Sequence, residues 1–494
     1  MHFRFLSAVL IALPWLWPIT AGPAATMVPY LASAGMGALL LAIWPARERA
    51  DGAAIVAWSW LAAALLSGLI ALLQYFDLEL PLYPVVNIAE PGRAFGNLRQ
   101  PNQLATLLII GLLALRWLLQ NQRLAALNAS WMAALLLVAL AATASRVGLV
   151  ELAALGVVVL WWSRHVAGGR KRFLVAIAIL AVFVLAAMAL PALIQNTEGV
   201  AGRDVLERLR NAESTCGSRL ILWNNVLHLI GQKPWFGWGW GELDYAHYIT
   251  LYDGPRFCHI LDNAHNLPLH LAVELGVPAA LLACALVAWL VWCSKPWSES
   301  DPTRQLAWGV LGAIAIHSMV EYPLWYGPFQ IAVALCIWLL WKPKQTAALS
   351  GPTKWRQWAA TAMMVAVVYA AWDYHRISQL FLPFEERAAA YQDNTLGQAH
   401  RSWLFSGVVG FAEVTTLPLT RESASRMLPL ALASLHFSPE PRIITKVIES
   451  ASLLDQDALA LAHMARFRAA FAREYREWAA LNAQLAETVQ SQSE

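Results

Sequence analysis

The segment Leu261-Asp262-Asn263-Ala264-His265-Asn266-Leu267 lies where a long polar loop runs into an apolar stretch that begins near Pro268. Such a junction places a histidine at the boundary between water and lipid, where a neutral imidazole can accept a proton from a hydroxyl. His265 is therefore a candidate catalytic base. The alternative is a histidine that only anchors a helix end at the interface.

The composition of the whole chain predicts a membrane protein. Of its 494 residues, 59% are hydrophobic and only 14% are charged, which is too apolar for a chain built of water-soluble domains alone. The net charge of +3 gives no reason to expect nucleic acid as a partner. Basic residues instead form short clusters between apolar runs, as loops on the cytoplasmic side of a membrane do.

Apolar runs divide residues 1–372 into about eleven expected membrane helices, near 1–20, 27–44, 53–73, 104–120, two within 131–162 that meet at Arg146, and then 173–191, 267–293, 304–319, 327–341 and 355–372. The first run also has the features of a cleaved signal peptide, but with so many later runs we expect a membrane helix. The basic segments at 45–49 and 163–172 should be cytoplasmic, which places the loop 74–103 and the long loop 192–266 on the outer side.

The fold class that follows is all-α: a polytopic helical bundle with a large periplasmic loop and a soluble α-helical C-terminal domain. Within the long loop, residues 204–213 form an amphipathic stretch and residues 218–231 a second helix-like one. From Asp373 onward the sequence is charged and alanine-rich, with apolar residues at helical spacing. The expected division is a membrane core over 1–372 and a periplasmic helical domain over 373–494.

In this topology the unusual polar residues collect on the outer side: Gln100, Asn102, Gln103, Arg146, Arg219, His265, Asn266, His317, Glu321 and Tyr322. A transporter more often has ionisable groups near the midplane. Guanidinium groups bind phosphate oxygens bidentately, and a histidine accepts the nucleophile's proton, so the set suits group transfer from a diphosphate. The sequence has no P-loop, HExxH motif or carboxylate cluster for Mg²⁺, so we expect neither a metal nor a cofactor.

Each candidate also has a structural interpretation. Arg146 could extend to lipid headgroups, and Arg219 could be an ordinary surface charge. Glu321 could pair with His317 four residues earlier. Tyr322 could be an aromatic residue of the interfacial belt. The remaining interpretations are caps or packing for Gln100 and Gln103, and an internal pair of His270 and Glu274 inside a helix over 267–293.

Two cysteines, Cys216 and Cys258, lie in the long outer loop just before Arg219 and His265. In an oxidising periplasm a disulfide between them is favoured, and it would hold together the two segments that carry these candidate residues. Unpaired thiols are the alternative. The other three cysteines, Cys284, Cys293 and Cys336, fall in apolar runs and are expected to be packing residues.

Several motifs follow one another along the chain: Gln100-Pro-Asn-Gln-Leu-Ala within 92–105, Ser145-Arg146, Gly217-Ser-Arg219-Leu, Lys233-Pro-Trp-Phe-Gly-Trp-Gly, Asp262-Asn-Ala-His265-Asn266-Leu and His317-Ser-Met-Val-Glu321-Tyr322-Pro-Leu. Together they resemble the PglL-type bacterial O-linked oligosaccharyltransferases, which share a membrane core with O-antigen ligases and polymerases. The resemblance covers nearly the whole chain.

The resemblance implies metal-independent transfer of a preassembled glycan from undecaprenyl diphosphate to a Ser or Thr hydroxyl of a periplasmic or pilin-like protein, at the bacterial inner membrane. It implies that His265 is the base, that Tyr322 orients acceptor or donor, and that Gln100, or else Gln103, is the functional glutamine of the first outer loop. Arg146 and Arg219 would hold the diphosphate. The supporting residues would be Asn102, Gln103, Asn266, His317 and Glu321. The alternatives are an O-antigen ligase with a lipid A-core acceptor and a lipid-linked glycan transporter.

Overall fold

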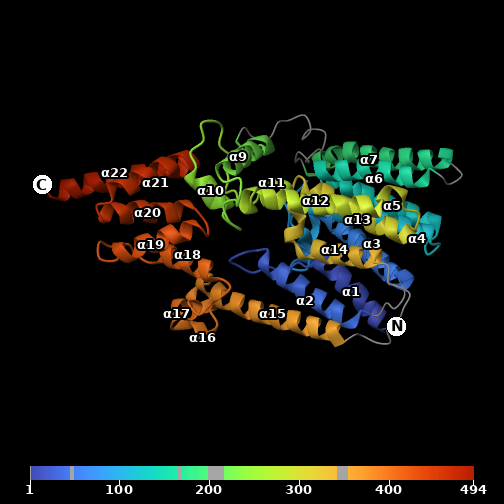
Figure 1. Cartoon of the computed structure of the whole chain (residues 1–494), viewed down its shortest axis with the longest axis horizontal. Coiled ribbons are helices and arrows are strands. Elements are labelled where there is room, and N and C mark those ends of the chain that lie inside the picture. The colour runs from blue at the N-terminus through green and yellow to red at the C-terminus, as the bar shows by residue number, and fades with distance from the viewer. Residues whose placement is uncertain (1, 45–48, 165–168, 199–215, 342–353, 494) are drawn as a thin grey trace. The chain divides into compact units, whose positions relative to one another are not determined.

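The structure, a computed structural model, describes residues 2–44, 49–164, 169–198, 216–341 and 354–493 (Figure 1). These residues form helices and no strands, which confirms the all-α prediction. The chain divides into two compact units. Unit 1 comprises 1–212 and 288–371, and unit 2 comprises 213–287 and 372–494. The predicted amphipathic stretch at 204–213 lies outside the described residues.

Unit 1 is built of apolar helices that coincide with the predicted runs: α1 (His2–Leu16), α2 (Met27–Ile43), α3 (Arg49–Tyr75), α4 (Pro101–Gln120), α5 (Ala126–Ala142), α6 (Arg146–Ser163), α7 (Gly169–Glu198), α13 (Pro302–Ser318) and α14 (Gly327–Leu340). Two further helices, α12 (Val277–Ser294) and α15 (Lys354–Ser378), contain the residues at which the chain passes between the units. As predicted, the apolar segment around Ser145 forms two helices: α5 ends at Ala142 and α6 starts at Arg146.

The single helix predicted over 267–293 is wrong. The run at 267–293 is two helices, α11 (Leu267–Leu275) and α12. The break is at Gly276, whose φ of +91° is costly for any residue with a Cβ atom. A Cβ at this position would also lie 2.2 Å from the carbonyl oxygen of Trp235, so backbone packing requires glycine there.

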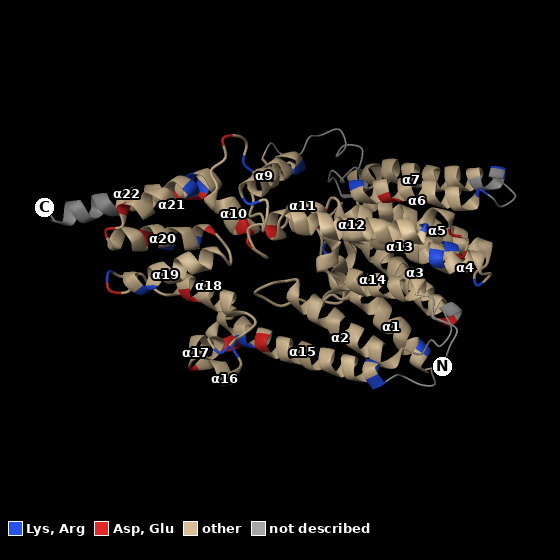
Figure 2. Ribbon diagram, in the orientation of Figure 1, with Lys and Arg blue, Asp and Glu red and all other residues tan. Residues whose placement is uncertain are grey.

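Five helical segments in the described ranges are long and apolar enough to cross a membrane: Asp51–Tyr75, Pro101–Gln120, Arg146–Ser163, Phe173–Gln195 and Val277–Ser298. Shorter apolar helices, such as α1, α2, α5 and α14, accompany them. Charged residues of unit 1 lie mostly near helix ends (Figure 2). This is the pattern of a membrane protein, while the total of about eleven spans and their orientation stay predictions.

The core of unit 1 centres on α4, which packs against α3, α5, α6 and α13. Leu104, Leu107 and Leu108 of α4 are completely buried. A Cβ atom at Gly111 would lie 2.4 Å from the Cβ of Ala64 in α3, so the two backbones approach closely at these small residues. Close packing at small side chains is a usual way for apolar helices to associate in lipid.

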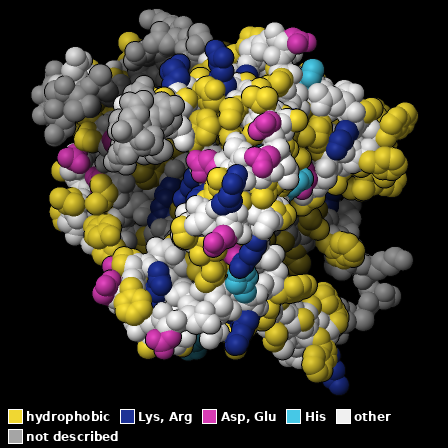
Figure 3. Space-filling model, turned by 90° about the vertical axis from the view of Figure 1, so that its left-hand side faces the viewer, with side chains coloured by type: hydrophobic (Ala, Val, Ile, Leu, Met, Phe, Trp, Pro, Cys, Tyr) yellow, Lys and Arg dark blue, Asp and Glu magenta, His cyan; other side chains and the backbone are white. Residues whose placement is uncertain are grey.

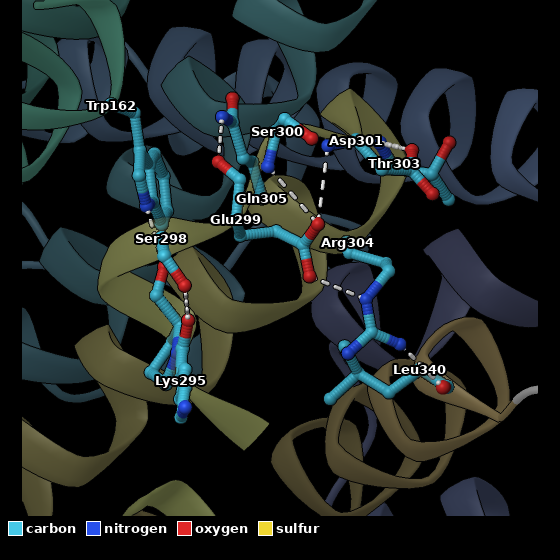
Figure 4. Close-up of polar contacts among 11 residues, drawn as sticks. Trp162, Lys295, Ser298, Glu299, Ser300, Asp301, Thr303, Arg304, Gln305 and Leu340 are labelled. Carbon is cyan, nitrogen blue, oxygen red and sulfur yellow. Dashed lines mark hydrogen bonds and ion pairs between the residues drawn. The ribbon is translucent and has the colours of Figure 1, made fainter. Parts of the chain in front are cut away.

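The connection from α12 to α13 is fixed by Glu299 (Figure 4). Its carboxylate accepts hydrogen bonds from the amides of Ser300 and Asp301 at 3.1 and 3.2 Å, and it pairs with Arg304. The guanidinium of Arg304 also donates to the carbonyl of Leu340, at the end of α14, at 2.8 Å. These contacts hold the start of α13, whose other end carries His317.

Unit 2 combines α9 (Arg219–Gln232), α10 (Leu243–Ile249) and α11 with the C-terminal helices α16 (Ala389–Gln392), α17 (Thr395–Ala399), α18 (Ser406–Thr416), α19 (Ala424–Leu435), α20 (Pro441–Leu453), α21 (Asp457–Ala470) and α22 (Ala472–Ser493). On the face shown in Figure 3, acidic and basic side chains are interspersed with hydrophobic ones.

The core of the C-terminal helices includes one residue from far earlier in the chain. Tyr248 of α10 is buried together with Phe411, Val447 and Phe467. Its hydroxyl lies 2.8 Å from Nδ1 of His463 in α21. Helix α10 and the C-terminal helices therefore share a core within unit 2, whereas α9 and α11 pack in a separate core.

Candidate functional site

In unit 1, the predicted glutamines lie at the start of α4. The side-chain oxygen of Gln100 accepts a hydrogen bond from the amide of Gln103 at 2.7 Å, and Pro101 occupies the first turn. Gln100 is therefore the N-cap of α4, the structural role considered above, while Gln103 is buried.

Asn102 joins α4 to two other segments that carry predicted site residues. Its side-chain oxygen accepts a hydrogen bond from the hydroxyl of Ser145 at 2.7 Å, and its amide nitrogen donates to Glu321 at 3.3 Å. Ser145 also caps α6 by accepting from the amide of Gly148 at 3.0 Å. The start of α4, the start of α6 and the segment after α13 are thus linked through one amide side chain.

A second set of contacts lies one helical turn deeper. The hydroxyl of Thr106 donates to the carboxylate of Glu151 at 2.8 Å and lies 2.8 Å from Nδ1 of His317. All three side chains are at most 1% exposed. The same hydroxyl lies 3.2 Å from the carbonyl oxygen of Asn102, so the direction of its proton sets the tautomer of His317. Among the described residues, Nε2 has no hydrogen-bond partner.

These two sets of hydrogen bonds hold the backbone segments that contain Arg146 and Tyr322. Arg146 is the first residue of α6, directly after Ser145. Tyr322 directly follows Glu321, and its ring stacks on Tyr326 with centroids 5.8 Å apart. His317 and Glu321 both contact α4, through Thr106 and Asn102 respectively. The structural interpretation from the sequence had them contact only each other.

The sequence analysis missed Thr106 and Glu151. A signal for both was present, because a lone carboxylate in an apolar run requires a partner, and Thr106 lies one turn after Asn102 on the same helix face. What the sequence could not give is the register of α6 against α4, which brings these two side chains together.

We predict that Thr106→Val destabilises the protein by roughly 1–3 kcal/mol, because it leaves a buried imidazole and a buried carboxyl without the hydroxyl between them. Thermal unfolding in one detergent, followed beside the wild type, measures the loss. Thr106→Ser keeps the hydroxyl and should unfold close to the wild-type temperature. A Thr106→Val protein as stable as the wild type would contradict the network.

In unit 2, a disulfide ties the start of α9 to the loop before α11. Cys216 and Cys258 are bonded, with Cα atoms 5.3 Å apart, and the amide of Cys258 donates to the carbonyl of Cys216 at 3.3 Å. Ser218 caps α9 by accepting from the amide of Leu220 at 3.2 Å. Arg219 follows as the first helical residue, on an anchored helix end.

His265 is held by its neighbours in a left-handed backbone conformation, with a φ of +49°. Its amide donates to the side-chain oxygen of Asn263 at 2.9 Å, and Asn266 caps α11 through the amide of Leu269 at 3.0 Å. The indole of Trp223 in α9 donates to the carbonyl of Ala264 at 3.1 Å. The helix that carries Arg219 therefore contacts the residue directly before His265.

We predict that Cys216→Ser lowers the free energy of unfolding of unit 2 by about 2–4 kcal/mol, because the sequence separation of 42 residues leaves a long loop open in the unfolded chain. Melting of the variant and of the wild type, each with and without reductant, measures the effect. Reductant should lower the melting temperature of the wild type and should leave that of Cys216→Ser unchanged. Cys284→Ser, in α12, is the control and should keep the wild-type response to reductant.

A second group of ionisable residues lies around α10. His247 accepts a hydrogen bond at Nδ1 from the hydroxyl of Tyr252 at 2.8 Å and donates from Nε2 to the carbonyl of Phe257 at 3.1 Å. Burial, and secondarily the nearby Arg256, lower the pKa of His247 to about 3, so this imidazole stays neutral and acts as scaffold. Burial likewise raises the pKa of Asp244 to about 7. Within the described ranges, no group of three or more His, Cys, Asp or Glu is arranged to hold a metal ion.

Comparison with known proteins gives matches along most of the chain. The family model described as protein glycosylation ligase matches residues 94–119, the O-antigen ligase model matches 131–284, and the C-terminal model of virulence factor membrane-bound polymerases matches 305–486. These segments contain the candidates Gln100, Arg146, Arg219, His265 and Tyr322.

Two curated relatives come from Acinetobacter baylyi (strain ATCC 33305 / BD413 / ADP1). The general O-oligosaccharyltransferase is 28% identical over 335 residues, which cover 65% of this chain and 56% of that protein. The ComP-specific O-oligosaccharyltransferase is 25% identical over 289 residues, which cover 57% of this chain and 50% of that protein. The chain thus spans about half the length of these relatives. By the order of its motifs and by these matches, the chain is a relative of the PglL-type bacterial O-oligosaccharyltransferases and of the O-antigen ligases.

Proposed function

We propose that this protein is an O-linked oligosaccharyltransferase that moves a preassembled glycan en bloc from undecaprenyl diphosphate to a Ser or Thr of a periplasmic or pilin-like protein. The observation that carries the proposal is the ordered match to the glycosylation ligase and O-antigen ligase models over the segments that contain the candidate residues. The description of the family model that matches residues 94–119, protein glycosylation ligase, favours a protein as the acceptor.

In the proposed reaction, the acceptor hydroxyl oxygen forms a bond to the anomeric carbon of the glycan, and the bond from that carbon to the diphosphate oxygen breaks. His265 accepts the hydroxyl proton, and undecaprenyl diphosphate leaves as the anion. One base and a good leaving group need no covalent enzyme intermediate, so we expect inversion at the sugar carbon. No step requires a metal ion.

Arg146 and Arg219 are proposed to bind the diphosphate. Each is the first residue of a helix, and the backbone amides at a helix N-terminus also favour anions. A guanidinium can bind two phosphate oxygens at once, and the interaction strengthens as the leaving group gains charge. Tyr322 and Gln100 are proposed to orient the acceptor or donor.

The remaining proposals concern location. The protein would lie in the bacterial inner membrane, with the candidate residues and the C-terminal helices in the periplasm. The C-terminal helices are proposed to bind the acceptor protein. A surface on which charges of both signs alternate with hydrophobic side chains is suited to a polypeptide partner (Figure 3).

An O-antigen ligase is the second candidate, favoured by the family model over 131–284. Purified protein is incubated with lipid-linked oligosaccharide and either a pilin-like protein or a lipid A-core acceptor. Glycan on the protein, absent with His265→Asn, supports the proposal. Glycan on the lipid acceptor alone establishes the ligase, and glycan crossing vesicle membranes without transfer establishes a transporter.

A further inference from the structure

Residues 233–241, here called the aromatic turn, expose several of the largest side chains of unit 2. The exposed fractions are 90% for Phe236, 73% for Trp235 and 63% for Trp240. Trp238 differs from them, because its indole donates to the carbonyl of Leu229 at 3.0 Å and the ammonium of Lys233 lies 4.0 Å from its ring centroid. The turn thus has one ring directed into the unit and three exposed to the surroundings.

The aromatic turn is rigidly attached to the chain around Gly276. The amides of Trp238 and Gly239 donate to the carbonyls of Val273 and Glu274 at 2.8 and 3.0 Å. The amide of Val277 donates in return to the carbonyl of Pro234 at 2.8 Å. The turn is therefore bonded to the end of α11 and to the first residue of α12.

Glycines make this attachment possible. A Cβ atom at Gly237 would lie 2.3 Å from the carbonyl oxygen of Glu274, and one at Gly276 would lie 2.2 Å from that of Trp235. Both residues also have positive φ, at +68° and +91°. The backbones of these two segments are thus in direct contact. The aromatic turn cannot move away from the start of α12 unless this contact is broken.

The helix that begins at this point is suited to lipid. Val277 opens a segment long and apolar enough to cross a membrane. Most of its side chains are exposed from the second turn on, with Leu281 at 64%, Leu282 at 72% and Leu286 at 52%. Such a surface is stable in hydrocarbon and costly in water.

We propose that the aromatic turn is an interfacial anchor whose exposed rings lie among the lipid headgroups of the leaflet that α12 enters. Tryptophan and phenylalanine beside a lysine, in a turn that is hydrogen-bonded to the first residue of a membrane helix, have the composition and the position of an interfacial aromatic belt. The lipid surface is favoured over a protein partner because the turn is continuous, through backbone hydrogen bonds, with the lipid-facing helix.

The anchor would also set the position of His265 relative to the bilayer. α11 has 9 residues, so at 1.5 Å per residue its two ends are about 14 Å apart. The turn binds one end of α11, and His265 lies just before the other. This consequence rests on the proposed function of His265, whereas the anchor itself does not.

Depth-dependent fluorescence quenching tests the anchor. The free cysteines are removed by Cys284→Ser, Cys293→Ser and Cys336→Ala, and the disulfide is kept. Phe236→Cys is labelled with an environment-sensitive dye in vesicles of phosphatidylcholine and phosphatidylglycerol with lipids brominated at different depths. Leu282→Cys in α12 is the lipid control, and the 64% exposed Leu461→Cys in α21 is the water control.

The label at 236 should be quenched most by bromine close to the headgroups and should be several-fold less accessible to aqueous iodide than the label at 461. Iodide quenching equal to that at 461, without bromine quenching, would overturn the proposal. Quenching by neither would also overturn it, because protein would then cover the turn. Thermal unfolding of each labelled variant shows that the fold is retained, and no outcome depends on glycan transfer.

Discussion

Glycan transfer by the His265→Ala variant is expected to fall by about 10²–10⁴-fold, the contribution typical of a general base. The side chain is only partly buried, so its removal opens no core cavity, and the contact of Trp223 goes to the carbonyl of Ala264. Transfer from lipid-linked oligosaccharide to a protein acceptor, measured at saturating donor, gives the loss in turnover.

The left-handed backbone at His265 calls for a second variant. A φ of +49° is less favourable for alanine than for asparagine, which occupies this region several-fold more often than most residues. His265→Asn therefore removes the base while preserving the backbone. Both variants should be inactive, and His259→Ala, at an exposed histidine of the same loop, should retain wild-type activity. An active asparagine variant would assign His265 a backbone role only.

Arg146→Lys is expected to reduce kcat/KM by about 10–100-fold, since a hydrogen bond to a charged group contributes about 1.5–3 kcal/mol and a point charge cannot reproduce a bidentate contact. The change preserves the charge at the start of α6 and leaves the Ser145 cap in place. Steady-state transfer over a range of donor concentrations separates weaker donor binding from slower turnover.

The matched control is Arg123→Lys, at an arginine that contacts the ring of Trp117 outside the candidate site. It should transfer glycan at the wild-type rate. If Arg146→Lys does the same, Arg146 contacts only lipid headgroups and the diphosphate must be bound by other groups. Thermal unfolding of both variants shows whether any loss reflects the fold.

The helices could be predicted because their signals are local. Apolar runs specified α1 to α7, and the polar Thr143 to Arg146 correctly ended one helix and began the next. The split between α11 and α12 was missed, because Gly276 is a single residue within the predicted run 267–293 and its need for a positive φ arises from the approach of Trp235. Contacts between segments distant in sequence leave no such local signal.

The candidate site shows the same division. Motif residues such as Asn102 and Glu321 could be selected from the sequence because they are polar and stand at the ends of apolar runs. Their hydrogen bond, and the deeper contacts of Thr106 with Glu151 and His317, depend on how α4, α6 and α13 pack. Likewise, nothing in the composition of α10 indicated that Tyr248 would be buried by helices from the C-terminal third of the chain.

The burial of Tyr248 has a consequence for biosynthesis. The ribosome completes α10 more than 150 residues before it reaches Phe411, the first of the later residues in the same core, and His463 emerges later still. Until then Leu243 and Ala246 of α10 can pack with α9, but the side of α10 that carries Tyr248 lacks its partners and is open to proteases and chaperones. Nascent chains arrested before α18 should therefore be cleaved near α10, whereas released full-length protein should resist.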